Sequence, residues 1–81
     1  MTITLYTKPV CIQCVATKRE LERRGMLFQE VDITQDHQAF DTVRGLGYMQ
    51  VPVVMAEGKH WSGFRPDKIA ALVSSQLEMV S

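Results

Sequence analysis

Cys11 and Cys14 are the residues whose type and spacing most directly indicate chemistry in this chain. A pair of thiols separated by two residues can form a disulfide, exchange it with another disulfide or bind a metal ion. Two cysteines are too few for the disulfide scaffold that small secreted domains use. We therefore expect a redox-active pair in the cytoplasm, where thiols are mostly reduced; a pair of inert buried thiols is the alternative.

Metal binding is a weaker interpretation of the same pair. A structural zinc site needs about four nitrogen or sulfur ligands. Only His37 and His60 could complete such a set, and neither has the spacing of a usual second ligand pair. The sequence therefore favours thiol–disulfide exchange, and no metal is expected.

The cysteines lie at the junction between a predicted strand and a predicted helix. Ile3–Thr7 is rich in β-branched residues, and Ile12–Arg24 consists mainly of good helix formers. Cys11 then falls at the helix start, where backbone N–H groups without helical partners and the helix dipole favour a thiolate. Cys14 follows about one turn later on the same face. We predict that Cys11 is the exposed nucleophile that attacks a partner's disulfide, and that the buried Cys14 resolves the mixed disulfide.

The rest of the chain predicts an α/β fold with the element order β-α-β-α-β-β-α. Further strands are expected at Leu27–Asp32, Val51–Met55 and Lys59–Ser62. Thr34 or Asp36 caps the second helix, and Pro66 begins the last one. Apolar residues at helical spacing mark these two helices: Ala39, Phe40, Val43 and Leu46, and then Ile69, Ala70, Leu72, Val73 and Leu77. With a right-handed crossover and a hairpin turn at Glu57-Gly58, we expect a four-stranded mixed sheet flanked by three helices on both faces.

Length, charge and hydropathy exclude several classes of protein. A chain of 81 residues is expected to form one domain, residues 1–81. Nine basic and nine acidic side chains give a formal net charge of zero, so nucleic acid and anionic membrane surfaces are not expected partners. No apolar run approaches the ~18 residues of a membrane span, and the N-terminus lacks the basic start of a secretory signal.

Two motifs together resemble a known family. Cys11-Ile12-Gln13-Cys14 follows the first strand, and Trp61-Ser62-Gly63-Phe64-Arg65-Pro66 precedes the last helix. This combination resembles the NrdH-redoxins, which have a glutaredoxin-like sequence and the thioredoxin fold. The resemblance extends to about Val73 and implies a single thioredoxin/glutaredoxin-like domain. It also implies that Val51-Pro52 is a cis-proline loop beside the disulfide, where the backbone of Val51 pairs with the substrate chain.

The resemblance further implies a role in electron transfer for deoxyribonucleotide synthesis. NADPH would reduce the protein through thioredoxin reductase, and the protein would reduce the large subunit of class Ib ribonucleotide reductase. No bound cofactor is implied, and the domain is expected to act as a monomer. The segment Trp61–Pro66 is expected to fasten the last helix to the sheet and to shape a surface near the disulfide. The partner-binding residues expected on this basis are Val51, Pro52, Trp61, Ser62, Gly63, Phe64, Arg65, Lys8, Gln13 and Met49.

Departures from typical glutaredoxins bear on the use of glutathione. Those proteins have a proline and an aromatic residue between the cysteines, Thr-Val-Pro at the cis-proline and an acidic pair at the last helix. This chain has Ile12-Gln13, Gln50-Val51-Pro52 and Arg65-Pro66-Asp67 instead. Two alternatives stay open. One is a glutathione-linked glutaredoxin, for which Asp67 could still accept an ammonium group, and the other is a thiol-based module that binds a metal or an iron–sulfur cluster.

Several residues near the pair have two interpretations each. Lys8 either stabilises the thiolate by its charge or is a solvated loop lysine. Thr7 and Gln13 are candidate polar neighbours of the sulfur. Arg65 either bonds backbone carbonyls or faces a partner's carboxylate, and Met49 either offers an adaptable apolar contact or fills a gap in the core.

Overall fold

The secondary-structure elements follow the order expected from the sequence. The computed structural model describes the backbone of residues 2–80 and the side chains of residues 2–74. The strands are β1 (Ile3–Thr7), β2 (Gln29–Asp32), β3 (Val53–Ala56) and β4 (Lys59–Ser62), and the helices are α1 (Ile12–Arg23), α2 (His37–Gly45) and α3 (Pro66–Val80). The side chain of Leu77, expected on the apolar stripe of the last helix, lies outside the described residues. None of the helices in residues 2–80 is long and apolar enough to span a membrane.

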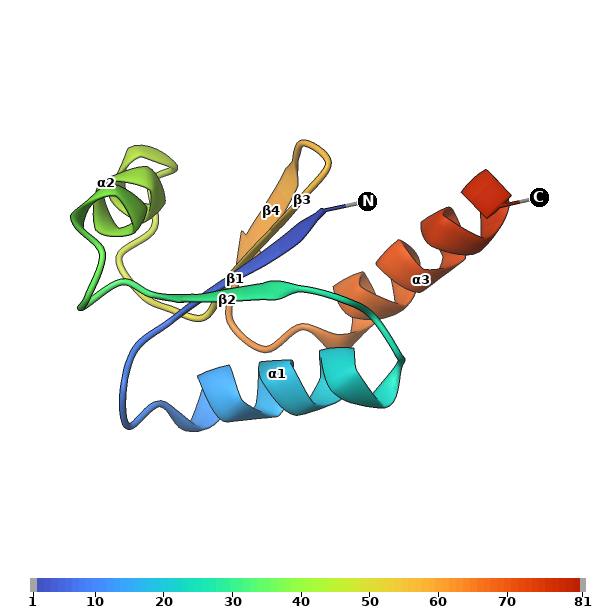
Figure 1. Cartoon of the computed structure of the whole chain (residues 1–81), viewed down its shortest axis with the longest axis horizontal. Helices are drawn as coiled ribbons and strands as arrows, with labels where there is room; N and C mark the ends of the chain where they lie inside the picture. Colours follow the sequence, from blue (N-terminus) through green and yellow to red (C-terminus); the bar gives the residue numbers. More distant parts are fainter. Residues whose placement is uncertain (1, 81) are drawn as a thin grey trace.

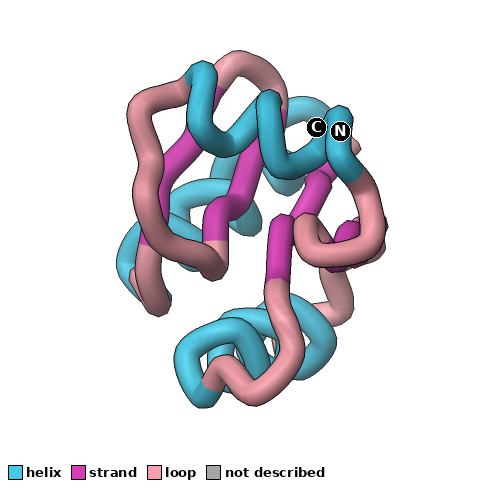
Figure 2. Tube along the Cα trace, turned by 90° about the vertical axis from the view of Figure 1, so that its left-hand side faces the viewer, coloured by secondary structure: helices cyan, strands magenta, loops and turns pink. Residues whose placement is uncertain are grey.

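The strands form one mixed sheet in the spatial order β2-β1-β3-β4. β1 pairs in parallel with β2, which requires the crossover through α1, and β3 runs antiparallel to both β1 and β4. Figure 1 shows α1 and α3 on one side of this sheet and α2 on the other, and Figure 2 shows the strands between the helices from a second direction. Tyr6 stands opposite Val53, so the end of β1 and the beginning of β3 meet at one end of the sheet.

Alternating side chains along the central strands build a core on each face of the sheet. Leu5 and Val54 point toward α1 and α3, and Tyr6 and Val53 point toward α2. The larger core comprises Ile3, Leu5, Leu21, Met26, Val54, Ala56, Trp61, Ile69 and Leu72, and the smaller one comprises Tyr6, Ala39, Val43 and Val53. Removal of these apolar side chains from water is the main favourable term that holds the helices on the sheet. It therefore also fixes the start of α1, where the cysteines lie.

Three expected features differ in the structure. β2 starts after Leu27, which is exposed, because the parallel pairing with β1 begins only beyond it. β3 starts at Val53 and not at Val51, because the chain before it leaves the sheet to form a loop. Phe40, expected on the buried stripe of α2, is exposed instead, and the guanidinium carbon of Arg44 lies 5.6 Å from its ring centroid.

The structure shows which of the two expected residues, Thr34 or Asp36, caps α2. Asp36 is the N-cap, and its Oδ1 accepts the backbone N–H of Ala39 at 3.0 Å. Thr34 instead donates its hydroxyl to Asp32 at 2.6 Å, within the turn that follows β2. The cap matters for the site because α2 leads directly into the loop before β3.

We predict that Asp36→Ala lowers the free energy of unfolding by about 1 kcal/mol, because the N–H of Ala39 loses its acceptor. The measurement is urea denaturation followed by circular dichroism. Asp41→Ala, an exposed aspartate within the same helix, is the matched control and should change stability by less than about 0.5 kcal/mol. Equal losses in the two variants would contradict the cap assignment.

Candidate active site

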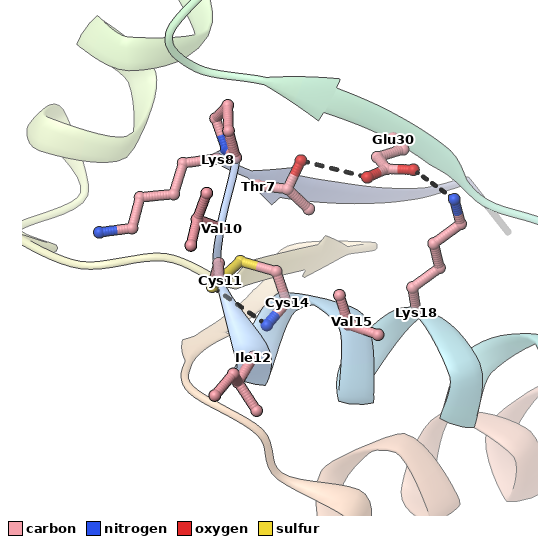
Figure 3. A pocket seen from close by; sticks show the side chains of 10 residues that line it. Thr7, Lys8, Val10, Cys11, Ile12, Cys14, Val15, Lys18 and Glu30 are labelled. Atoms are coloured by element: carbon pink, nitrogen blue, oxygen red, sulfur yellow. Dashed lines mark hydrogen bonds and ion pairs between the residues drawn. A yellow bond between two sulfur atoms is a disulfide. The ribbon is translucent and has the colours of Figure 1, made fainter.

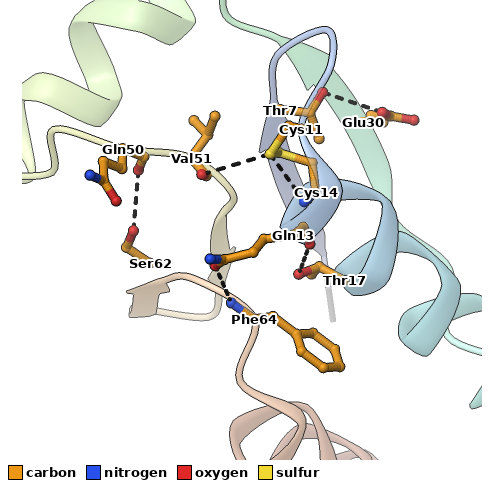
Figure 4. Close-up of a disulfide and its surroundings, with 10 residues drawn as sticks. All are labelled: Thr7, Cys11, Gln13, Cys14, Thr17, Glu30, Gln50, Val51, Ser62 and Phe64. Carbon is orange, nitrogen blue, oxygen red and sulfur yellow. Dashed lines mark hydrogen bonds between the residues drawn. A yellow bond between two sulfur atoms is a disulfide. The ribbon is translucent and has the colours of Figure 1, made fainter.

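Cys11 is the N-cap residue of α1, immediately before the helical backbone begins. Its extended backbone, with φ −131° and ψ 105°, directs the side chain back over the first turn. There its Sγ accepts the backbone N–H of Cys14 at 3.1 Å (Figure 4). This N–H has no partner within the helix. The contact and the positive end of the helix dipole favour negative charge on this sulfur, so the geometry stabilises a Cys11 thiolate after reduction.

The two cysteines form a disulfide in the structure. Their Cα atoms are 5.2 Å apart, which is the separation that the expected one-turn spacing allows. Cys14 is only 4% exposed, whereas Cys11 is half-buried. A sulfur atom of another protein can therefore approach Cys11 more easily than Cys14. This difference is what the expected roles of nucleophile and resolving cysteine require.

A cis peptide bond joins Val51 and Pro52, as the resemblance implied. The antiparallel pairing of β1 with β3 brings this loop beside the start of α1. The carbonyl oxygen of Val51 lies 3.9 Å from the Sγ of Cys11 (Figure 4). A disulfide sulfur carries no proton, so this contact becomes a hydrogen bond only when Cys11 is a free thiol. The backbone of Val51 therefore lies next to the reacting sulfur.

The segment from Ser62, the last residue of β4, to Phe64 contacts both the cis-proline loop and the first helix. Gly63 donates its N–H to the Pro52 carbonyl at 2.8 Å, and Ser62 donates its hydroxyl to the Gln50 carbonyl at 3.1 Å. On the other side, Phe64 donates its N–H to Oε1 of Gln13 at 3.3 Å. Gly63 adopts φ +90°, a conformation that favours glycine. The side chain of Gln13 thus points to Phe64 and not to the sulfur (Figure 4). The sequence carries no local signal for the contact between Gln13 and Phe64, because the two residues are far apart in the chain.

Thr7 forms its side-chain hydrogen bond with a residue other than cysteine, and the side chain of Lys8 points away from the disulfide. The hydroxyl of Thr7 donates to Glu30 Oε2 at 3.2 Å, and Glu30 Oε1 pairs with Lys18 Nζ at 3.0 Å. The hydrogen bond from Lys18 to Glu30 raises the pKa of Lys18. Lys8 is exposed, and its ammonium group points away from the disulfide in Figure 3, which favours the solvated loop lysine. The Lys18–Glu30 pair has no local signal in the sequence, since it joins α1 to β2 and depends on how the helix packs on the sheet.

Arg65 pairs with a carboxylate of its own chain. Its Nε donates to Asp67 Oδ1 at 3.2 Å, and its Nη2 donates to Asp67 Oδ2 at 3.0 Å. Hydrogen bonding from this guanidinium lowers the pKa of the Asp67 carboxyl. Among the described residues, the side chain of Arg65 thus bonds the Asp67 carboxylate and not the backbone carbonyls of the loop. Asp67, the group that could accept the ammonium of glutathione, is already engaged.

The aromatic residues of the segment Trp61–Pro66 have separate locations. Trp61 is 6% exposed and packs in the larger core with Ile69 and Leu72 of α3. This burial fastens α3 to the sheet, and it limits Trp61 to an indirect effect on any partner. Phe64 remains exposed, and Met49 is 76% exposed, so Met49 does not fill a gap in the core.

Exposed apolar side chains surround the disulfide. This apolar rim consists of Val10, Ile12, Val15 and Met49. Its first three members line a hollow together with both cysteines (Figure 3), and Met49 lines a second hollow with Val51. Exposed apolar groups gathered at one site are typical of a surface that another protein covers. The reacting sulfur thus opens onto a surface suited to protein contact.

Val10 is the most exposed member of the rim, at 101% of its reference area, and it directly precedes the nucleophile. Its φ is +54°, in the left-handed region that β-branched residues rarely adopt. Such a conformation typically costs about 1–3 kcal/mol and is concentrated at functional sites. Sequence reasoning missed this residue, because neither its side-chain type nor its neighbours indicate a positive φ.

Metal-ligating side chains do not gather elsewhere in the part of the chain that the structure describes. Within it there is no group of three or more His, Cys, Asp or Glu residues that could hold a metal ion. His37 and His60 are both exposed. The arrangement around Cys11 and Cys14 is suited to disulfide exchange.

Comparisons with known proteins agree with this chemistry. The glutaredoxin family model matches residues 3–61. The glutaredoxin-like protein NrdH of Salmonella typhimurium is 51% identical over 72 residues, covering 89% of each chain. NrdH of Lactococcus lactis is 31% identical over 86% of this chain and 97% of its own. The solved structure of the glutaredoxin-like NrdH-redoxin from Escherichia coli, a protein described by its thioredoxin-like activity profile, has a TM-score of 0.86. It shares 46% sequence identity and covers 89% of this chain and 95% of that one.

We predict that Val10→Asn raises the free energy of unfolding by about 1 kcal/mol, because asparagine tolerates a positive φ better than a β-branched residue. The same change should raise the KM for a protein disulfide such as insulin roughly fivefold, because an apolar contact is lost. Urea denaturation and insulin reduction measure the two effects. Leu27→Asn, an exposed apolar residue outside the rim, is the control and should leave KM unchanged. A Val10→Asn protein with unchanged stability would refute the strain argument.

Proposed function

The chain belongs to the NrdH-redoxins of the glutaredoxin family, and from this we propose that it carries electrons from thioredoxin reductase to class Ib ribonucleotide reductase. It is a thiol–disulfide oxidoreductase with a Cys11–Cys14 disulfide. In the proposal, NADPH is the electron source for the reductase, and the large subunit of ribonucleotide reductase is the acceptor. The cytoplasm, expected from the cysteine usage, is the compartment of this exchange.

The proposed reaction transfers two electrons through a mixed disulfide. The Cys11 thiolate attacks one sulfur of the partner's disulfide, forms a bond to it and expels the other sulfur as a thiolate, which takes a proton from water. Cys14 then loses its proton and attacks the Sγ of Cys11. This second step forms the Cys11–Cys14 disulfide, breaks the mixed disulfide and releases the partner as a dithiol. Thioredoxin reductase reverses the oxidation of the pair.

The apolar rim is the observation that best supports a protein partner. A protein chain can cover Val10, Ile12 and Val15 and pair its backbone with Val51 at the same time. A small, charged tripeptide such as glutathione gains little from apolar contacts and needs charged groups that recognise its ends. The Asp67 carboxylate, one such group, is already paired with Arg65. These contacts favour thioredoxin reductase over glutathione as the electron donor.

We predict that the protein supports NADPH-dependent reduction of insulin when thioredoxin reductase is present. Glutathione with glutathione reductase should support a rate at least about tenfold lower, because the Asp67 carboxylate that could bind its ammonium is paired with Arg65. Oxidation of NADPH at constant protein concentration measures both rates. Equal rates with the two donors would remove the basis for preferring thioredoxin reductase.

We predict that Cys11→Ser abolishes turnover with thioredoxin reductase and insulin, because the nucleophile is lost. Cys14→Ser should instead accumulate a mixed disulfide between Cys11 and the partner, because the resolving thiol is missing. Electrophoresis without reductant detects this adduct as a band of the combined mass that dithiothreitol removes. Repeated turnover by the Cys14→Ser protein would show that a monothiol route operates and that the assigned roles are wrong.

A further inference from the structure

Tyr48 and His60 form a contact that no part of the proposed reaction uses. The hydroxyl of Tyr48 lies 2.7 Å from Nδ1 of His60, and the two rings meet edge to face with centroids 5.5 Å apart. Tyr48 lies in the chain between α2 and the cis-proline loop, whereas His60 lies on the edge strand β4. The contact therefore ties the beginning of the loop to the far edge of the sheet. With the neutral imidazole protonated on Nε2, Nδ1 accepts the hydrogen bond that Tyr48 donates.

Two side chains of β4 hold the same short segment, whose first residue, Tyr48, also donates its backbone N–H to the carbonyl of Val43 at 3.2 Å. His60 and Ser62 are two residues apart on β4, so their side chains lie on the same face of the sheet. His60 contacts Tyr48, and Ser62 donates to the carbonyl of Gln50 at 3.1 Å. The segment from Tyr48 to Gln50 is thus fixed at both ends. Met49, between the two contacts, projects into solvent.

The segment from Tyr48 to Gln50 leads directly to Val51, whose backbone carbonyl lies beside the sulfur of Cys11. Val51 follows Gln50, and its carbonyl oxygen lies 3.9 Å from the Sγ of Cys11. A change in the direction of the chain at Tyr48 would therefore turn both Met49 of the apolar rim and the backbone of Val51. A loop that is ordered before docking saves the conformational entropy that a mobile loop would lose on docking.

We propose that Tyr48 and His60 are positioning residues, which hold Met49 and Val51 in the orientation that a partner's polypeptide chain docks against. The inference rests on the proposed function, since it takes Val51 as the docking group. Neither residue lines the hollow around Cys11 and Cys14, so the pair acts on docking and not on bond exchange. Loss of the contact between Tyr48 and His60 should raise the KM for a protein disulfide and leave kcat unchanged.

Tyr48→Phe tests the hydrogen bond with the least disturbance, because it keeps the ring and removes only the hydroxyl. We expect its KM for insulin, with dithiothreitol as the recycling reductant, to rise about two- to tenfold, the range that corresponds to one hydrogen bond. The kcat should not change, and neither should the rate at which the reduced protein reacts with 5,5′-dithiobis(2-nitrobenzoate), a small disulfide that does not need the loop. His60→Ala should have the same effect as Tyr48→Phe, and the double variant should be no worse than either single variant.

Two further variants separate positioning from general stability. His60→Asn keeps a hydrogen-bond acceptor near the tyrosine hydroxyl and should recover at least half of the KM effect of His60→Ala. His37→Ala, the other exposed histidine, is the control and should leave KM unchanged. Additive effects of Tyr48→Phe and His60→Ala, or a lower melting temperature with an unchanged KM, would overturn the inference.

Amide hydrogen exchange gives a second readout that does not depend on activity. The amides of Tyr48 and Gly63, which donate to the carbonyls of Val43 and Pro52 at the two ends of the loop, should exchange at least about twofold faster in Tyr48→Phe, because the loop opens more often. If the unmodified protein fails to reduce insulin, the proposed function fails, and the exchange rates alone decide whether Tyr48 positions the loop. Unchanged exchange rates at these amides would overturn the inference in that case too.

Discussion

The hydrogen bond from the Cys14 backbone N–H to the sulfur of Cys11 is the interaction on which the chemistry of this protein depends. A helix start always leaves N–H groups without helical partners, and here one of them points at a cysteine side chain. The arrangement exists because β1 ends shortly before Cys11 and α1 begins immediately after it. The larger core holds α1 on the sheet, so the direction of this N–H is set by packing as much as by the local chain. Disulfide exchange at Cys11 follows from that one placement.

The site is completed by segments that come from the other end of the chain. The antiparallel pairing of β1 with β3 brings the cis-proline loop to the sulfur, and the segment after β4 holds this loop through the backbone of Pro52. Each of these segments has polar backbone groups that need hydrogen-bond partners, and the loop and the segment after β4 provide them for each other, as in the bond from Gly63 N–H to the Pro52 carbonyl. The same assembly leaves the apolar rim uncovered around Cys11. A chain that presents an activated sulfur, an ordered loop and an apolar surface at one place is suited to meeting another protein.

Features with a local signal were predicted well from the sequence. The strand before Cys11, the helix start at Pro66 and the hairpin at Glu57-Gly58 all occur where the residue types indicate. Predictions that needed the position of a distant residue were less successful. Gln13 contacts Phe64 and not the sulfur, and Thr7 donates to Glu30. Both side chains have several possible partners of similar chemistry, and only the packing of the helices and strands selects one.

The sequence by itself determined the reacting pair, the order of the elements and the family to which the motifs point. These features depend on residues close together in the chain, where spacing and propensity have direct geometric consequences. Only the tertiary structure decided that Trp61 belongs to the core and that Val10 adopts a positive φ. It alone decided that Tyr48, before β3, meets His60 on β4. The physical reason is that burial and long-range hydrogen bonds depend on how the helices and strands pack, and the local pattern of residue types does not contain that packing.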